Sequence, residues 1–107
     1  MVLCDAVPFC FGPISKLVSL AESLREFAYL TALVSGTSKE LGQFGPFDKL
    51  IDCNTEKPSQ LQKQRHYFER SKLFLNVMNP ISAKFAAKCQ TPSAQVDSLF
   101  WMWEDIP

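Results

Sequence analysis

The sequence predicts an all-α fold, a compact irregular bundle of four to six helices in one domain of 107 residues. Two observations predict it. The stretch GPISKLVSLAESLREFAYLTALV repeats apolar residues every three or four positions, as an amphipathic helix does. In addition, five of the seven prolines stand just ahead of helix-compatible segments, where a missing N–H and a fixed φ suit the first helical turn.

The N-terminal half is predicted to contain one long helix. Residues 1–12 predict an extended arm laid across the helices, with a short strand as the alternative. Pro13 opens the long helix, which covers about residues 13–35 and ends before Gly36, a residue suited to the left-handed position after a helix. The second half of this helix is apolar nearly all round, so we expect it to form the core.

Short helices are expected next. The T-x-x-E pattern that starts at Thr37 forms a capping box for a short helix, and Pro46 begins a second apolar turn. Residues 58–78 predict one helix with a polar first half and an apolar second half. A strand at Leu73–Val77 is the alternative, because periodicity cannot separate a short apolar run into helix or strand.

The C-terminal third is predicted to hold two more helices, each introduced by proline. Asn79-Pro80 combines a cap with a first-turn proline ahead of the small-residue segment ISAKFAAKC. Thr91-Pro92 is a second pair of a capping residue and a first-turn proline, ahead of the last helix, which is predicted within residues 92–107. This last segment is aromatic and acidic.

The candidate partner-binding surface lies in the segment LFWMWEDIP. An amphipathic helix with large apolar anchors matches a helix-in-groove ligand, and aromatic anchors dominate interface energetics. The alternative is that the segment docks on its own core. Trp103-Glu104-Asp105-Ile106 also resembles the W-x-x-I core by which autophagy receptors add a strand to ubiquitin-like modifiers. The proposed partner-binding residues are Phe100, Trp101, Trp103 and Ile106.

The charges are sorted along the chain although their sum is zero. Residues 57–88 carry seven basic groups and one acid, whereas the segments before and after them are each net acidic. Either the ends fold back on the middle, or the basic middle faces an acidic partner. A nucleic-acid-binding domain, as in a viral accessory protein, is the alternative function. The side chains proposed for those contacts are Lys63, Arg65, Arg70 and Lys72.

The motifs of catalysis, metal binding and cofactor binding are missing from the sequence. His66 is the only histidine, and it lies in a basic stretch without a nearby acid to orient it, as a surface histidine does. The four cysteines form no C-x-x-C pair, and the four glycines stand singly. We therefore expect no enzyme, no metal, no cofactor and no small-molecule substrate.

The expected function is that of a non-catalytic protein-interaction module, an adaptor or a small subunit of an assembly. A zero net charge gives little protection against association, so a protein partner or a homodimer is expected. Four charges within residues 14–34 exclude a membrane span there. The start of the chain lacks the positive charge of a signal peptide, which favours reduced thiols in the cytoplasm or nucleus.

Overall fold

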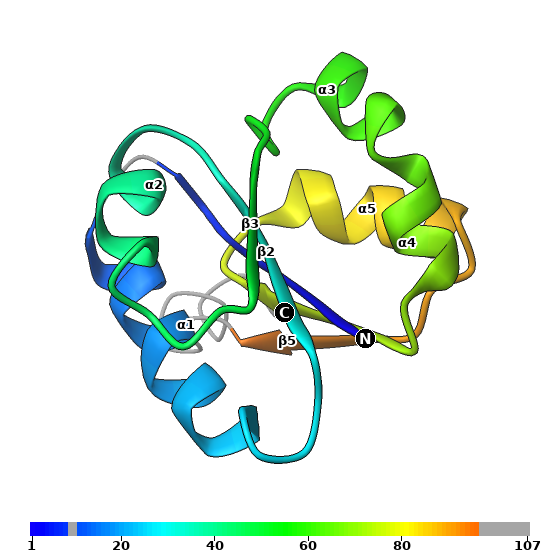
Figure 1. Cartoon of the computed structure of the whole chain (residues 1–107). Coiled ribbons are helices and arrows are strands. Elements are labelled where there is room, and N and C mark those ends of the chain that lie inside the picture. The colour runs from blue at the N-terminus through cyan, green and yellow to red at the C-terminus, as the bar shows by residue number, and fades with distance from the viewer. Residues whose placement is uncertain (9–10, 97–107) are drawn as a thin grey trace, which may run out of the picture.

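The computed structural model describes residues 1–8 and 11–96, which form a five-stranded parallel β-sheet flanked by helices (Figure 1). This is an α/β fold, so the prediction of an all-α bundle is wrong. The elements follow one another in the order β1 Val2–Ala6, α1 Phe11–Leu24, β2 Leu30–Val34, α2 Gly36–Gly42, β3 Lys49–Asp52, α3 Pro58–Lys63, α4 Arg65–Arg70, β4 Leu73–Val77, α5 Pro80–Lys88 and β5 Ser93–Val96.

The strand order in the sheet is β3-β2-β1-β4-β5, and every neighbouring pair is parallel. β1 is the central strand. The chain runs outward from β1 through β2 to β3. It then crosses back over the sheet to form β4 beside β1, and runs outward again to β5. Because all five strands are parallel, their carboxyl ends lie at one edge of the sheet.

Helices cover both faces of the sheet (Figure 1). α1 and α2 pack on one face, where Ile14 and Leu17 meet the side chains of Cys4 and Val77. α3, α4 and α5 pack on the other face around Phe68, whose ring centroid lies 4.9 Å from Phe74 and 5.0 Å from Phe85. Within residues 1–8 and 11–96, no helix is long and apolar enough to cross a membrane.

The long helix predicted over residues 13–35 is wrong in its second half. α1 ends at Leu24, whose carbonyl accepts hydrogen bonds from the N–H groups of Phe27 and Ala28, and the chain then enters β2. All five residues of β2 are buried. A parallel strand covered on both faces is apolar at nearly every position rather than at every second one. The sequence LTALV therefore shows no alternation, and it continues the helical period that precedes it.

The single helix predicted over residues 58–78 is also wrong. α3 and α4 are separate short helices, and Ser71 takes up an extended backbone after them. The alternative of a strand at Leu73–Val77 is confirmed, since β4 has these bounds. Like β2, this strand is buried along nearly its whole length, so its apolar run gave no periodic signal.

The two ends of the chain also differ from the main prediction. The expected arm at residues 1–12 contains the central strand β1 and the start of α1, so the alternative of a short strand is confirmed. Within the helix predicted for residues 92–107, Ser93–Val96 form the edge strand β5 instead. Residues 97–107 lie outside the described part of the chain.

Local helix signals were read correctly in several places. Pro58 and Pro80 each occupy the first turn of a helix. α2 lies where a short helix was predicted, but its N-cap is Ser35 with Ser38 as the third helical residue, so the capping box predicted from Thr37 is wrong. The side chain of Asn79 caps α5 by accepting hydrogen bonds from the N–H groups of Ile81 and Ser82. Pro46 and Pro92, however, precede the strands β3 and β5. Proline thus marks where an element begins but does not decide its type.

Candidate functional site

The candidate site lies at the carboxyl edge of the sheet, between β1 and β4. These strands are neighbours, but the chain leaves β1 to form α1 on one face and leaves β4 to form α5 on the other. In open parallel sheets, ligands bind outside the carboxyl ends of the strands at the point where the winding reverses, because the two connections diverge there. In this chain, the point of reversal is the pair β1 and β4.

Asp5 is a buried residue of β1 that lies beneath this part of the edge. It is the fourth residue of β1, and its side chain is 0% exposed. The carboxylate oxygen Oδ1 accepts a hydrogen bond from Thr55 Oγ1 at 2.9 Å. The other oxygen, Oδ2, accepts one from Asn79 Nδ2 at 3.0 Å and one from Ser82 Oγ at 2.5 Å. One carboxyl group therefore joins β1 to the β3–α3 connection, to the β4–α5 turn and to α5.

The partners of Asp5 are also bonded to one another. Asn79 Nδ2 donates a second hydrogen bond to Thr55 Oγ1 at 2.8 Å. Asn76 Nδ2 donates to the Asn79 carbonyl and to Ser82 Oγ, each at 2.8 Å. Among the described residues, every buried side-chain nitrogen and oxygen has a hydrogen-bond partner. A buried polar network that is fully satisfied is rigid, so it holds the two connections in fixed positions.

The protonation of Asp5 changes near neutral pH. Burial raises the pKa of this carboxyl group from its ordinary value of 3.8 to about 7, although the hydrogen bonds from Ser82, Thr55 and Asn79 act in the opposite direction. Because the side chain has no exposed surface, a ligand at the edge cannot touch it. We therefore assign Asp5 a positioning role beneath the site.

The turn after β4 contains a strained residue. Met78 has a φ of 60°, in the left-handed region that residues other than glycine and asparagine rarely adopt. Such a conformation costs on the order of 1 kcal/mol, and strained residues of this kind cluster at functional sites. The N–H of Met78 donates to the carbonyl of Val96 at 2.9 Å, so the strained turn also holds the end of β5.

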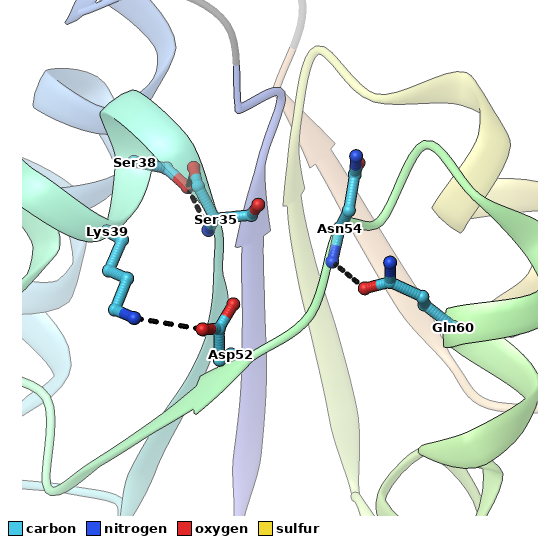
Figure 2. A network of polar contacts seen from close by, with 6 residues as sticks. All are labelled: Ser35, Ser38, Lys39, Asp52, Asn54 and Gln60. Atoms are coloured by element: carbon cyan, nitrogen blue, oxygen red, sulfur yellow. Dashed lines mark hydrogen bonds and ion pairs between the residues drawn. The ribbon is translucent and has the colours of Figure 1, made fainter.

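A second set of polar side chains follows β2 and β3 at the same edge (Figure 2). The N–H of Cys53 donates to the Val34 carbonyl at 2.9 Å, so the chain leaving β3 passes beside the end of β2. The bonds drawn in Figure 2 are Ser35 N–H to Ser38 Oγ at 2.9 Å, Lys39 Nζ to Asp52 Oδ2 at 2.9 Å, and Asn54 N–H to Gln60 Oε1 at 2.7 Å. The edge thus presents hydroxyl and amide groups beside the β1–β4 junction.

The basic residues proposed for nucleic-acid or acidic-partner contacts lie along the α3–α4 stretch rather than at the β1–β4 junction. Lys63 ends α3, while Arg65 and Arg70 begin and end α4. Lys72 directly precedes β4, at the opposite, amino edge of the sheet. Arg65 Nε forms an ion pair with Glu69 at 3.3 Å. A role of these side chains in binding stays a prediction.

The proposed partner-binding residues Phe100, Trp101, Trp103 and Ile106 lie outside the described residues, and their role also stays a prediction.

His66 lies at the surface, whereas Cys4 and Cys53 lie in the hydrophobic core. His66 is exposed, and its ring centroid lies 4.2 Å from that of Tyr67. Cys4 and Cys53 are free and buried, and burial raises their pKa values to about 12 and about 11, which keeps both as unreactive thiols. In residues 1–8 and 11–96, no three His, Cys, Asp or Glu side chains gather closely enough to hold a metal ion.

The Asp5 network was not among the features predicted from the sequence. One signal was present: an acidic residue within the apolar run VLCDAV must find buried partners if that run is a strand. Its partners are Thr55, Asn79 and Ser82, which follow two other strands in the sequence. Once the strands are known, polar residues directly after their carboxyl ends are the expected place for a site.

Comparisons of this chain with protein-family models, with curated proteins and with solved structures find no match.

Proposed function

We propose that the domain binds a small polar ligand at the carboxyl edge of the sheet, beside the β1–β4 junction. The single observation that supports this most strongly is the strand order β3-β2-β1-β4-β5 in an all-parallel sheet. This order matches the first five strands of the doubly wound order 3-2-1-4-5-6, in which nucleotides bind where the strand order reverses. The support comes from the arrangement of the strands and not from a sequence fingerprint.

The β1–α1 connection indicates what kind of ligand fits. Dinucleotide-binding domains have three glycines here, because the backbone must approach the pyrophosphate closely. In this stretch the chain has a single glycine, Gly12. A Cβ atom added to Gly12 would meet nothing within 4 Å, so no close backbone approach requires glycine there. A dinucleotide is therefore a poor candidate. Hydroxyl and amide groups at Ser35 and Asn54 suit a ligand rich in hydroxyl or phosphate oxygens, and we propose a mononucleotide or a nucleotide sugar.

The proposal can be tested by nuclear magnetic resonance titration of the ¹⁵N-labelled chain with AMP, UMP, UDP-glucose and NADPH, one at a time. We expect a mononucleotide or UDP-glucose to shift the amide resonances of Val7, Ser35, Asn54, Met78 and Asn79, while NADPH binds no better than AMP. Shifts at the amino edge instead, or no shifts with any of the four compounds, would contradict the proposal.

A matched pair of variants locates the site independently. Ser35→Trp places a large side chain at the carboxyl edge, and Ser93→Trp places the same side chain at the amino edge, where β5 begins. We expect Ser35→Trp to weaken binding at least tenfold, which corresponds to about 1.4 kcal/mol, and Ser93→Trp to leave it unchanged. Equal effects of the two substitutions would show that binding occurs elsewhere.

Protein–protein interaction is a second candidate function, and one observation favours it. Phe27 and Phe44 expose 82% and 80% of their surfaces, which is unusual for phenylalanine unless a partner covers it. A homodimer or a protein partner would bury these rings. Light scattering at several concentrations tests the homodimer: we expect a dimer that persists in high salt and becomes monomeric in Phe44→Ser. A monomer at all concentrations would leave only a foreign partner for this surface.

The free thiols suggest the compartment. Cys4 and Cys53 are buried and not disulfide-bonded, which suits a reducing compartment. We propose the cytoplasm or nucleus on this basis.

A further inference from the structure

A groove lies between α1 and β5, on the face of the sheet that carries α1 and α2. It has a volume of about 360 Å³ and is lined by Ser15, Lys16, Ser19, Leu20 and Val96. Its walls are mostly apolar, and Leu20 is 37% exposed in it. The last described residue of the chain, Val96, forms part of the wall.

The register of β5 shows that this face of the strand is open. Val96 pairs with Val77 and Ala94 pairs with Leu75, so both side chains point to the α1 face, where Val77 and Leu75 belong to the core. Ala94 is nevertheless exposed. α5 packs on the opposite face of β5. Parallel strands occur almost only in sheets covered on both faces, so β5 requires a cover on the α1 side.

The part of the chain that continues from β5 has the right composition for this cover. Residues 97–107 have the sequence DSLFWMWEDIP, which combines five large apolar side chains and an isoleucine with three acids. The groove begins where β5 ends, so no linker is needed to reach it. Eleven extended residues span up to about 36 Å, more than enough to run along α1.

Charge complementarity points to the same occupant. Lys16 stands at the rim of the groove and forms no ion pair with any carboxylate of the described residues. The segment brings Asp97, Glu104 and Asp105 and no basic residue. We propose that residues 97–107 of the same chain dock in the groove between α1 and β5, with aromatic side chains over Leu20 and Val96 and an acidic group beside Lys16.

Tryptophan fluorescence of the full chain tests this docking directly. Both tryptophans of the protein, Trp101 and Trp103, are in the segment, so the emission reports on this segment alone. The expected result for the natural sequence is emission blue-shifted from that of the synthetic peptide 97–107, with weaker quenching by acrylamide. Emission and quenching equal to those of the free peptide would overturn the proposal. That result is the one expected if the aromatic segment is kept free for a foreign partner.

A matched pair of substitutions identifies the groove. Leu20→Glu adds a carboxylate to the α1–β5 groove, and Ile81→Glu adds one on the opposite face of the sheet, where Ile81 lines a separate pocket and is equally exposed. We expect Leu20→Glu to shift the emission to the red and raise quenching to the level of the free peptide. Ile81→Glu should change neither. No change in folded Leu20→Glu, checked by circular dichroism, or the reverse pattern would show that the segment docks elsewhere.

Zero-length cross-linking with a carbodiimide gives a test that does not depend on the folding of Leu20→Glu. The coupling joins the Lys16 amine to a carboxylate with loss of water. Peptides that link Lys16 to residues 97–107 are expected from the monomer band, in a yield independent of protein concentration. Their absence, or their presence only in the dimer band, would overturn docking within one chain. Lys16→Arg, which keeps the charge but offers no amine, is the control and should lose the cross-link.

Discussion

At the scale of single residues, the most informative group is the carboxyl group of Asp5. It lies beneath the proposed ligand site and takes three hydrogen bonds from side chains located 50, 74 and 77 positions away in the sequence. Three donors favour its charged form, and complete burial opposes it. Because burial is the stronger effect, the pKa rises to about 7. The stability of the protein should therefore depend on pH in the neutral range.

The direction of this pH dependence follows from how strongly Asp5 holds its proton in the folded and in the unfolded state. The folded protein holds the Asp5 proton up to about pH 7, whereas the unfolded chain loses it near 3.8. Between these values the folded state binds more protons, so the free energy of unfolding falls as pH rises through this range and levels off above it. The decrease attributable to Asp5 is on the order of 4 kcal/mol at most. Denaturant unfolding at pH 5, 6, 7 and 8 measures it.

Substitution separates the contribution of Asp5 to the pH dependence of stability from that of the other acidic residues. Asp5→Asn keeps the shape and removes the charge, so we expect its free energy of unfolding to lack the decrease between pH 5 and 8. Asp52→Asn, a surface substitution that removes the ion pair to Lys39, should keep the pH dependence of the natural sequence. A natural protein whose stability is flat from pH 5 to 8 would mean that Asp5 is already ionised.

At the scale of elements, α5 combines a well-capped start with a strained backbone just after its end. Its start is capped by Asn79, and its end forms a Schellman turn: Gln90 N–H donates to the Ala87 carbonyl at 3.0 Å, and Thr91 N–H donates to the Ala86 carbonyl at 2.9 Å. The left-handed position in this turn belongs to Gln90, with a φ of 60°. Glycine is the residue that usually stands there, because it has no Cβ to clash.

Replacement of Gln90 by glycine should therefore stabilise the protein. Gln90 is exposed, so little packing is lost, and relief of the left-handed backbone is expected to raise the free energy of unfolding by about 1 kcal/mol. Gln62→Gly is the matched control, because Gln62 is an exposed residue of α3. Glycine within a helix lowers the free energy of unfolding by about 1 kcal/mol. Denaturant midpoints of the two variants should move in opposite directions. A loss of stability in Gln90→Gly would contradict the assigned turn.

At the scale of the whole molecule, the sheet divides into a protected centre and two open edges. β1, β2 and β4 are buried along most of their length, whereas β3 and β5 are largely exposed. Edge strands also have one row of backbone groups without a strand partner. The three central strands should therefore be the most stable part of the fold, and the proposed ligand site lies at the end of this stable unit.

Amide hydrogen exchange measures this difference. We expect the slowest exchange in Leu3–Asp5, Thr31–Leu33 and Leu75–Asn76, through opening of the whole domain, and faster exchange in Lys49–Asp52 and Ser93–Val96 through local opening. Equal protection of all five strands would indicate that both edges are covered, for example by a second copy beside β3. Slow exchange confined to one half of the sheet would indicate two separate folding units.

The sequence alone determined those features that depend on neighbouring residues. The Asn79 cap, the prolines that start α3 and α5, the place of α2 and the amphipathic helix α1 were all readable, because each rests on contacts within a few positions. The exposed position of His66 was also readable, from the polar residues around it.

Only the tertiary structure decided that the apolar runs LTALV and LFLNV are strands. Their burial on both faces removes the alternation that marks a half-exposed strand, and the pairing partners that stabilise them lie tens of residues away. The same holds for the candidate site. Asp5 meets Thr55, Asn79 and Ser82 only because the chain crosses the sheet and brings β4 beside β1, and no local pattern in the sequence encodes that crossing.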